Sequence, residues 1–276
     1  MPQAARVDTL LQAAGTLRRE ARMLLAQASG LPEASLAAFP ERLIDAAAAA
    51  RFRDWAQRRC DGEPFAYIVG KREVYGRSFK VTPAVLIPRP ETELLIDRAL
   101  ECARTLQQPR ILDLGTGSGA IAITLACELA QAQVTAIDAA GSALEVAEAN
   151  GRALAPGRVE LIASDWFTAL KGRSFELIVA NPPYISSGDP HLACGDLRFE
   201  PRTALVGGGD GLQCINAIVA AAPRYLADAG WLLLEHGFDQ GAPVRARLAV
   251  AEFESITTWR DLAGLERISG GQRPAE

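Results

Sequence analysis

The chain has 276 residues, 49% of them hydrophobic, which is enough to bury one full core and a second, smaller one. A formal net charge of −4 and a pI near 5.4 exclude proteins that hold nucleic acid mainly by bulk positive charge. Residues 1–80 contain 13 Lys and Arg against 9 Asp and Glu, whereas the remainder contains 16 against 24. This asymmetry indicates two units, and we interpret the basic front as a solvated helical face.

The metal-binding and membrane classes lack support in the sequence. No CxxC pair occurs, and the chain has only 2 histidines, so we expect no bound metal. No apolar run approaches the roughly 18 residues that a membrane span needs, and we expect no membrane partner. Unpaired cysteines without a secretion signal are typical of the cytoplasm, which is the location we expect. The cysteines are Cys60, Cys102, Cys127, Cys194 and Cys214.

Residues 1–70 are expected to form a small helical bundle of about four short helices. Apolar residues recur at helical spacing over 7–30, where Gly30 is a typical residue to end a helix. The same texture continues, broken at Pro40, to the turn formed by Gly62 and Pro64. Residues 71–90 are rich in Val, Tyr and Phe and then in proline, which predicts a connector containing a hairpin.

Residues 91–276 predict a doubly wound, Rossmann-like α/β domain, because near-continuous apolar strands alternate with amphipathic helices. Ligands bind beyond the carboxyl ends of the strands in such a domain. The polar and glycine residues at those predicted ends are Gly115, Asp138, Asp165, Trp166, Asn181, Glu235 and His236. The expected strands cover 110–115, 133–139, 159–167, 175–184 and 230–237, and the expected helices start near 91 and cover 119–131, 141–154 and 211–230.

A glycine turn, "DLGTGSGA" at 113–120, joins the first of these strands to a helix. Glycine tolerates positive φ and lets a ligand approach the main chain, while the N–H groups at a helix start hold anionic groups. Asp138 follows Gly119 by nineteen positions, near the spacing at which an acid binds a ribose. Asp165 and Trp166 supply an acceptor and a ring suited to an adenine. A ribose-bearing ligand is favoured, although the GxGxxA pattern also leaves NAD open.

The segment "NPPY" at 181–184 ends the predicted fourth strand. Pro182 and Pro183 have no N–H, so the Asn181 side chain and the Pro182 carbonyl present acceptors, beside the flat ring of Tyr184. The complement of this surface is a planar NH₂ group conjugated to a π-system. Two acceptors orient such a weakly nucleophilic nitrogen toward an electrophile, and the ribose-bearing ligand with a suitable one is S-adenosylmethionine. The pattern therefore predicts methylation of an amino group, with catalytic roles for Asn181 and Pro182.

Other functions stay open on these residues alone. An enzyme that methylates the amino group of adenine or cytosine in DNA or RNA needs the same planar-nitrogen site, but it would usually carry a basic face or a recognition domain. A non-catalytic nucleotide-binding module on the same fold would not require the NPPY segment. A nicotinamide oxidoreductase would also leave this segment without a role.

Five segments together resemble the release factor glutamine methyltransferases, the HemK/PrmC family. They are "DGEPFAYIVGKREVYG", "LIPRPETE", "DLGTGSGA", "NPPYI" and "RFEPRTAL", and the similarity covers nearly the whole chain. The resemblance implies methylation of the side-chain amide nitrogen, N5, of the glutamine in the Gly-Gly-Gln motif of class 1 peptide chain release factors. It also implies S-adenosyl-L-methionine as methyl donor and S-adenosyl-L-homocysteine as product.

The resemblance also assigns roles to residues and domains. It implies that Asp138 binds the donor's ribose, that Asp165 and Trp166 lie beside its adenine, and that Asn181 stands between donor and substrate. Residues 1–70 would help to bind the release factor, and we expect a monomer with no stable nucleic-acid partner. For the segment around Glu235 and His236 we favour a structural role over contact with the substrate, which stays open. The donor loop is Gly115, Thr116, Gly117, Ser118 and Gly119, and the glutamine-binding segment is Asn181, Pro182, Pro183 and Tyr184.

Overall fold

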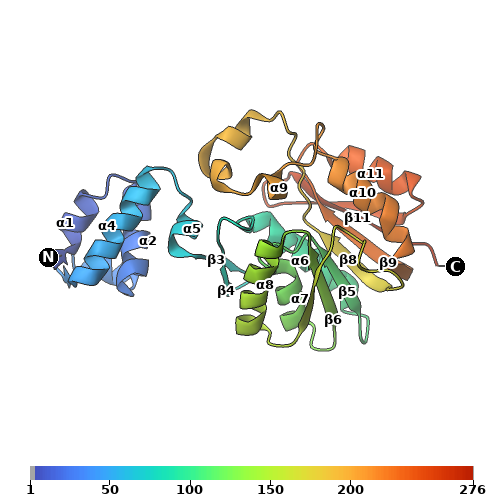
Figure 1. Ribbon diagram of the computed structural model, residues 1–276, viewed down its shortest axis with the longest axis horizontal. Helices are drawn as coiled ribbons and strands as arrows, with labels where there is room; N and C mark the ends of the chain where they lie inside the picture. Colours follow the sequence, from blue (N-terminus) through green and yellow to red (C-terminus); the bar gives the residue numbers. More distant parts are fainter. Residues whose placement is uncertain (1–3, 276) are drawn as a thin grey trace. The chain divides into compact units, whose positions relative to one another are not determined.

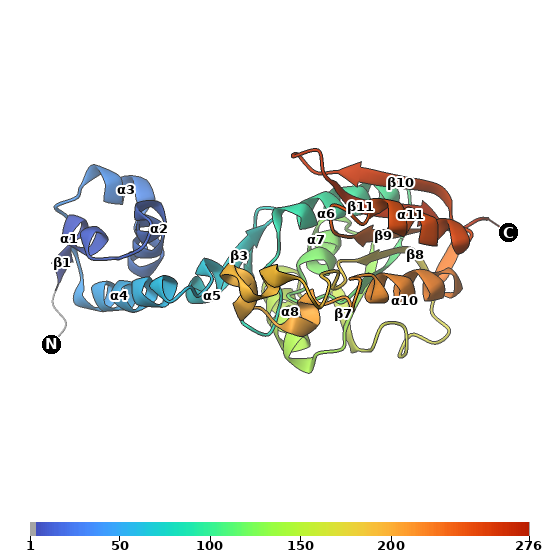
Figure 2. The same ribbon diagram turned by 90° about the horizontal axis from the view of Figure 1, so that it is seen from above.

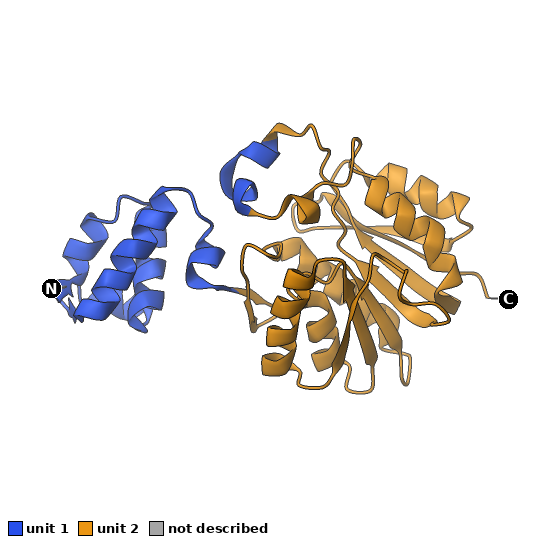
Figure 3. Cartoon of the chain, in the orientation of Figure 1, with its two compact units in different colours: residues 1–71, 191–199 blue, residues 72–190, 200–276 orange. Residues whose placement is uncertain are grey.

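The computed structural model describes residues 4–275, which divide into two compact units (Figure 3). Unit 1 runs to Lys71 and includes the distant segment His191–Phe199. Unit 2 consists of Arg72–Pro190 and the chain from Glu200 onward. The division lies one residue beyond the end of the expected front domain, but the inclusion of 191–199 in unit 1 was not foreseen.

Unit 1 is a helical bundle with a two-residue ribbon, β1 (Ala5–Arg6) and β2 (Leu43–Ile44). Gly30 ends α2 in the left-handed conformation at φ 72°, as its position in the sequence predicted. Asp45 begins α4 by accepting a hydrogen bond from the Ala48 N–H at 2.9 Å. The helices are α1 (Val7–Gln12), α2 (Arg18–Ser29), α3 (Glu33–Ala38), α4 (Ala46–Cys60) and α5 (Phe65–Val69).

The segment 191–199 is held in unit 1 by polar contacts. The Arg198 guanidinium donates to the main-chain oxygen of Asp61 at 3.0 Å, and Arg59 forms an ion pair with Asp196 at 3.6 Å. An ideal Cβ on Gly62 would lie 1.8 Å from the Arg198 guanidinium, so this contact needs a glycine there. The two short 3₁₀ turns are η1 (Pro190–Ala193) and η2 (Gly195–Phe199).

Unit 2 contains a seven-stranded sheet in the order β10-β11-β9-β8-β5-β6-β7 (Figure 1). The five strands from β9 to β7 are parallel, which confirms the predicted Rossmann-like fold. β11 is antiparallel to β9 and pairs with β10 to form one edge of the sheet (Figure 2). The strands are β5 (Arg110–Leu114), β6 (Gln133–Asp138), β7 (Val159–Ala163), β8 (Phe175–Ala180), β9 (Leu226–Glu235), β10 (Glu254–Arg260) and β11 (Glu266–Gln272).

Helices cover both faces of the sheet. Side chains alternate between the two faces along each strand, and apolar residues on each face form a separate buried cluster. Ile111 and Val179 pack in one buried cluster with α6 and α7, whereas Leu112 and Ile178 pack in a second cluster with α10 and α11. The hairpin of β3 (Lys71–Val74) and β4 (Arg77–Lys80) precedes this layer. The helices are α6 (Pro90–Ala103), α7 (Ala120–Glu128), α8 (Gly141–Leu154), α9 (Arg202–Leu205), α10 (Gln213–Ala221) and α11 (Gly241–Val250).

The sheet has its topological switch point between β5 and β8. The chain proceeds from β5 to β6 and β7 in one direction, then returns to β8 on the other side of β5. Loops leaving β5 and β8 therefore diverge and form a crevice at their carboxyl ends, where ligands bind in open α/β sheets. No helix within residues 4–275 is long and apolar enough to cross a membrane.

Several predicted elements were too long, and the strand expected over 175–184 ends at Ala180, because Pro182 and Pro183 lack the N–H groups that a paired strand needs. The helix expected over 211–230 ends as an α-helix at Ala221, one residue before the 3₁₀ turn η3 (Ala222–Arg224) that contains Pro223. Proline lacks the N–H that a continuing helix needs, and the chain enters β9 from Leu226. The strand expected over 159–167 ends at Ala163, because the following residues turn toward the crevice.

Candidate active site

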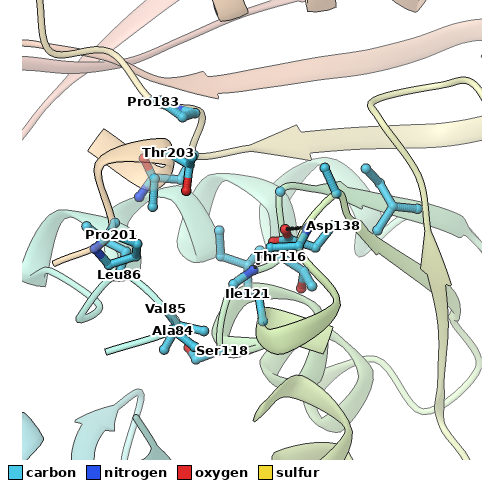
Figure 4. A pocket seen from close by; sticks show the side chains of 18 of the residues that line it. Ala84, Val85, Leu86, Thr116, Ser118, Ile121, Asp138, Pro183, Pro201 and Thr203 are labelled. Carbon is cyan, nitrogen blue, oxygen red and sulfur yellow. Dashed lines mark hydrogen bonds between the residues drawn. The ribbon is translucent and has the colours of Figure 1, made fainter. Parts of the chain in front are cut away.

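A cavity of about 370 Å³ lies at the carboxyl ends of β5, β6 and β8, within the usual size range of small-molecule sites. Figure 4 shows Leu86 and Pro201 at one side of it and Thr116 and Asp138 at the other. Its lining brings together most of the site residues that the sequence predicted: Gly115, Thr116, Gly117, Ser118, Asp138, Asp165, Trp166, Asn181 and Pro183. The remaining predicted residues, Gly119, Pro182 and Tyr184, do not line it.

The glycine turn has a backbone that other residues would adopt only under strain. Gly115, Gly117 and Gly119 have φ values of 72°, 55° and 81°. A Cβ on Gly119 would lie 2.7 Å from the Cδ1 atom of Ile123, so this glycine also permits close packing below the turn. The N–H groups of Gly115 and Thr116 donate to the Ile137 carbonyl at 3.0 and 2.9 Å, which ties the turn to β6.

Asp138 is held by main-chain donors on both sides. Its Oδ2 accepts from the Gly117 N–H and its Oδ1 from the Ala140 N–H, each at 2.9 Å. A carboxylate has about four acceptor positions, so each oxygen retains capacity for a ligand hydroxyl. The acid predicted to bind a ribose is therefore fixed beside the glycine turn and lines the cavity.

A second acid, Asp113, lies fully buried below the turn and was missed in the sequence. Its Oδ2 accepts from the Thr116 hydroxyl at 2.7 Å and from the Ala122 N–H at 3.3 Å. Its Oδ1 has no hydrogen-bond partner. Burial outweighs these two bonds and raises the pKa of Asp113 to about 7. The glycine turn therefore rests on a buried acid whose pKa lies near neutral pH.

Trp166 has a positive φ of 45°, which is rare for a large side chain and marks a strained position. Its carbonyl accepts from the Ser164 hydroxyl at 2.7 Å, and the same hydroxyl accepts from the Ala169 N–H at 3.1 Å. A Cβ on Gly115 would lie 3.8 Å from the Trp166 ring, so the ring flanks the glycine turn. Trp166 and its neighbour Asp165 both line the cavity.

The NPPY segment follows β8 directly. Asn181 and Pro183 line the cavity, Pro182 is buried, and Tyr184 directs its hydroxyl to Glu235 Oε1 at 3.2 Å. The Tyr184 carbonyl accepts from the Gln240 side chain at 3.0 Å, which anchors the segment to the loop after β9.

His236 is fully buried, and burial lowers its pKa. Its Nδ1 donates to the Gly237 carbonyl and its Nε2 accepts from the Ser269 hydroxyl, both at 2.8 Å. Both ring nitrogens of the neutral imidazole are hydrogen-bonded, so His236 has a structural role in joining the end of β9 to β11.

Two loops complete the cavity, and a buried acid joins them. Glu200 is 4% exposed; it accepts from the Ile87 N–H at 2.9 Å and forms an ion pair with Arg89. The connected segments, each a loop that runs into the start of a helix, line the cavity with Ala84, Val85, Leu86, Pro88 and Thr92 from one and Pro201, Thr203 and Ala204 from the other. Both segments carry the family resemblance, but no role in the cavity was predicted for them.

Asn150 on α8 links the glycine turn to the hairpin. Its side-chain amide donates to the carbonyls of Ser118 and Lys80 at 2.8 and 3.0 Å and accepts from the Lys80 N–H at 2.7 Å. Asn150 is 3% exposed, so this fully bonded amide is part of the core. The one feature of the sequence that could have indicated this role is that Asn150 is a polar residue on the apolar face of the predicted helix.

The sheet topology and the glycine-lined cavity at its switch point define a Rossmann-like methyltransferase. Residues 91–217 match the family model of the methyltransferase small domain, and residues 5–70 match that of the PrmC N-terminal domain. A methyltransferase structure from Pyrococcus furiosus superposes with a TM-score of 0.54 at 17% identity, covering 80% of this chain and 98% of that one. The likeness to that structure concerns the fold alone.

Sequence relatives define the family more closely. The chain is 49% identical over 265 residues to a release factor glutamine methyltransferase of Pseudomonas aeruginosa, covering 96% of each chain. It is 47% identical over 279 residues to that of Burkholderia pseudomallei, covering 99% of this chain and 98% of the relative. The chain belongs to the release factor glutamine methyltransferase family, which confirms the resemblance.

Proposed function

We propose that this enzyme transfers a methyl group from S-adenosylmethionine to the side-chain amide nitrogen of the glutamine in the Gly-Gly-Gln motif of class 1 release factors. One observation carries the chemistry: Asn181 lines the same cavity as the glycine turn and Asp138. A group that orients an amide nitrogen therefore stands beside residues suited to a ribose-bearing methyl donor. The names of the relatives supply the target protein and amino acid.

The residues around the cavity fit the methyl donor. Glycines at positive φ leave the main chain accessible, Asp138 retains acceptor capacity for ribose hydroxyls, and the Trp166 ring supplies an apolar surface for an adenine. S-adenosylmethionine supplies an electrophilic methyl group on its sulfonium sulfur. We assign the predicted cofactor roles to the turn, to Asp138 and to the Asp165–Trp166 pair.

Asn181 binds and orients the substrate amide in this proposal. An amide nitrogen is a weak nucleophile because its lone pair is delocalised into the carbonyl. An acceptor that binds one of its protons fixes the nitrogen toward the methyl group, and positioning of this kind contributes several kcal/mol to lowering a barrier. The nitrogen attacks the methyl carbon, and the carbon–sulfur bond breaks to release S-adenosylhomocysteine. The nitrogen loses its proton to water as the new C–N bond forms, so a strong base is not required. Pro183 supplies an apolar boundary without an N–H at this position.

The test is transfer of radiolabelled methyl groups to three acceptors offered in parallel. They are a class 1 release factor, its Gln→Ala variant in the Gly-Gly-Gln motif, and duplex DNA. We expect label on the unmodified release factor alone. Label on DNA would support the second candidate, an amino-methyltransferase for adenine or cytosine, and label on the Gln→Ala variant would place the methyl group on another residue.

A further inference from the structure

Asn181, the first residue after β8, and Glu235, the last residue of β9, occupy equivalent positions at the ends of two neighbouring parallel strands. Ala180 at the end of β8 pairs with Leu234 in β9, so the next residue on each strand stands beside the other. Glu235 is 1% exposed, and its Oε1 accepts from the Tyr184 hydroxyl at 3.2 Å. Its Oε2 is sealed from solvent without a hydrogen-bond partner. A buried carboxylate with an unsatisfied oxygen thus lies directly behind the NPPY segment.

The surroundings of Glu235 do not neutralise it as a structural ion pair would. The charged groups that face it are Glu91 on α6 and Arg267 on β11. Arg267 is shared between Asp261, at 3.0 Å, and Glu91, at 3.7 Å. Burial raises the pKa of Glu235 to about 7, while the Tyr184 hydroxyl and the Asn181 side chain favour its ionised form. Burying a carboxyl group with one unpaired oxygen costs free energy, so its presence here points to a role beyond packing.

We propose that Glu235 is a positioning residue that sets the orientation of the Asn181 amide. An Asn side chain has a donor end and an acceptor end, and only its carbonyl oxygen can accept a proton from the substrate NH₂. An ionised Glu235 is acceptor-only, so it selects the rotamer in which Asn181 turns its NH₂ inward and its oxygen toward the substrate. Tyr184 donates to the same carboxylate and holds it in place. This inference rests on the proposed role of Asn181, and it replaces the purely structural role expected for Glu235.

The experiment compares Glu235→Gln, Asn181→Ala and the double variant in the full chain, with a release factor as substrate. Glu235→Gln keeps the shape but adds an NH₂ group that competes with the inward donors. We expect kcat to fall by about 100-fold, as misplacement of a catalytic group can cause, with the Kd for S-adenosylhomocysteine unchanged. In the Asn181→Ala background the same substitution should add no further loss, because the group it orients is absent.

A pH profile separates positioning from a merely structural role. A protonated Glu235 can donate and no longer selects the Asn181 rotamer, so kcat of the wild-type enzyme should rise as the pH rises through about 7. Glu235→Gln should abolish this acid limb. Glu176→Gln is the matched control, because Glu176 lies at the opposite end of β8 and pairs with Arg110. We expect this control to keep both kcat and the acid limb.

The outcomes distinguish this inference from the proposed function. Near-normal turnover by Asn181→Ala would refute the role of Asn181 itself. Turnover within threefold of wild type in Glu235→Gln, or losses that multiply in the double variant, would overturn the inference alone. If Glu235→Gln does not fold, Tyr184→Phe replaces it: loss of a donor to the carboxylate should move the acid limb to higher pH, and an unmoved limb would contradict the proposal.

Discussion

The Asp138 carboxylate accepts a hydrogen bond from the Gly117 N–H at 2.9 Å, joining the end of β6 to the turn after β5. A second bond at 2.9 Å, from the Ala140 N–H, fixes the other oxygen. The acid therefore orders the glycine turn, and we propose that its remaining acceptor positions bind the ribose of the donor. Its replacement should affect donor binding before any other property.

Asp138→Asn should weaken binding of S-adenosylhomocysteine by at least about tenfold, because hydrogen bonds to a charged group contribute roughly 1.5–3 kcal/mol. The introduced side-chain amide would place an NH₂ group against the N–H of Gly117 or Ala140, and one hydrogen bond that orders the turn would be lost. Isothermal titration calorimetry measures the Kd. Asp228→Asn, at a largely exposed side chain, is the control and should bind normally. An unchanged Kd in Asp138→Asn would remove Asp138 from the donor site.

Asn181→Ala should lower kcat by about 100-fold or more while leaving the Kd for S-adenosylhomocysteine nearly unchanged. The substitution removes an acceptor that acts on the substrate nitrogen, and losses of this size follow removal of a preorganised group in other enzymes. Steady-state methyl transfer together with calorimetry separates the two effects. A parallel loss of donor binding would instead assign Asn181 to the donor pocket.

Gly119→Ala should destabilise the protein by about 1–3 kcal/mol, since it forces a side chain into a positive φ of 81°. Its Cβ would also lie 2.7 Å from Ile123. Gly141→Ala, at the start of α8, is the matched control because no atom lies within 4 Å of its ideal Cβ. Urea unfolding should show a loss in the first variant and no loss in the second. Equal stability would mean that the turn does not need this glycine.

Asp113 should make the free energy of unfolding fall as the pH rises from about 4 to about 7. Its pKa is raised on folding, so over this window the folded state retains a proton that the unfolded state has lost. Asp113→Asn removes the titration, and the stability difference between the two proteins isolates it. Urea unfolding at about pH 4.5 and about pH 7.5 measures this difference. The free energy of unfolding of the variant, relative to that of the wild type, should be larger at the higher pH. A pH-independent difference would contradict the burial argument.

Glu200→Ala should weaken S-adenosylhomocysteine binding by about tenfold, because the Ile87 N–H and Arg89 would lose their partner and the two loops their connection. Differential scanning fluorimetry with increasing ligand measures both the binding and the stability of the free protein. Glu148→Ala, on the exposed face of α8, serves as the control. If ligand stabilises both variants equally, Glu200 does not organise the donor pocket.

Local pattern accounted for most of the fold. The helix expected over 141–154 has the same bounds in the structure, because its apolar residues repeat at helical spacing from its first residue, Gly141. The helix expected over 211–230 failed at Pro223, since the apolar residues beyond it serve equally well in a strand. The antiparallel pairing of β11 with β9 depends on long-range contacts that no local pattern records.

The motifs that line the cavity were predicted, but the distant residues that hold them in place were not. The glycine turn and Asn181 carry unusual residues at strand ends, where the fold rule locates ligands. Glu200 and Ile87 are 113 positions apart, and Asn150 and Lys80 are 70 apart, so their hydrogen bonds exist only after folding. The neighbourhood of Glu235 and Asn181 likewise exists only after folding, because it depends on the pairing of β8 with β9.

The location of the transferred methyl group tests the proposed reaction best. A class 1 release factor is treated with enzyme and S-adenosylmethionine, digested, and mapped by fragment-ion mass spectrometry. We expect one added methyl group on the side-chain nitrogen of the glutamine in Gly-Gly-Gln, and its absence after treatment with Asn181→Ala. A methyl group on any other residue, or full modification by Asn181→Ala, would refute the proposed function.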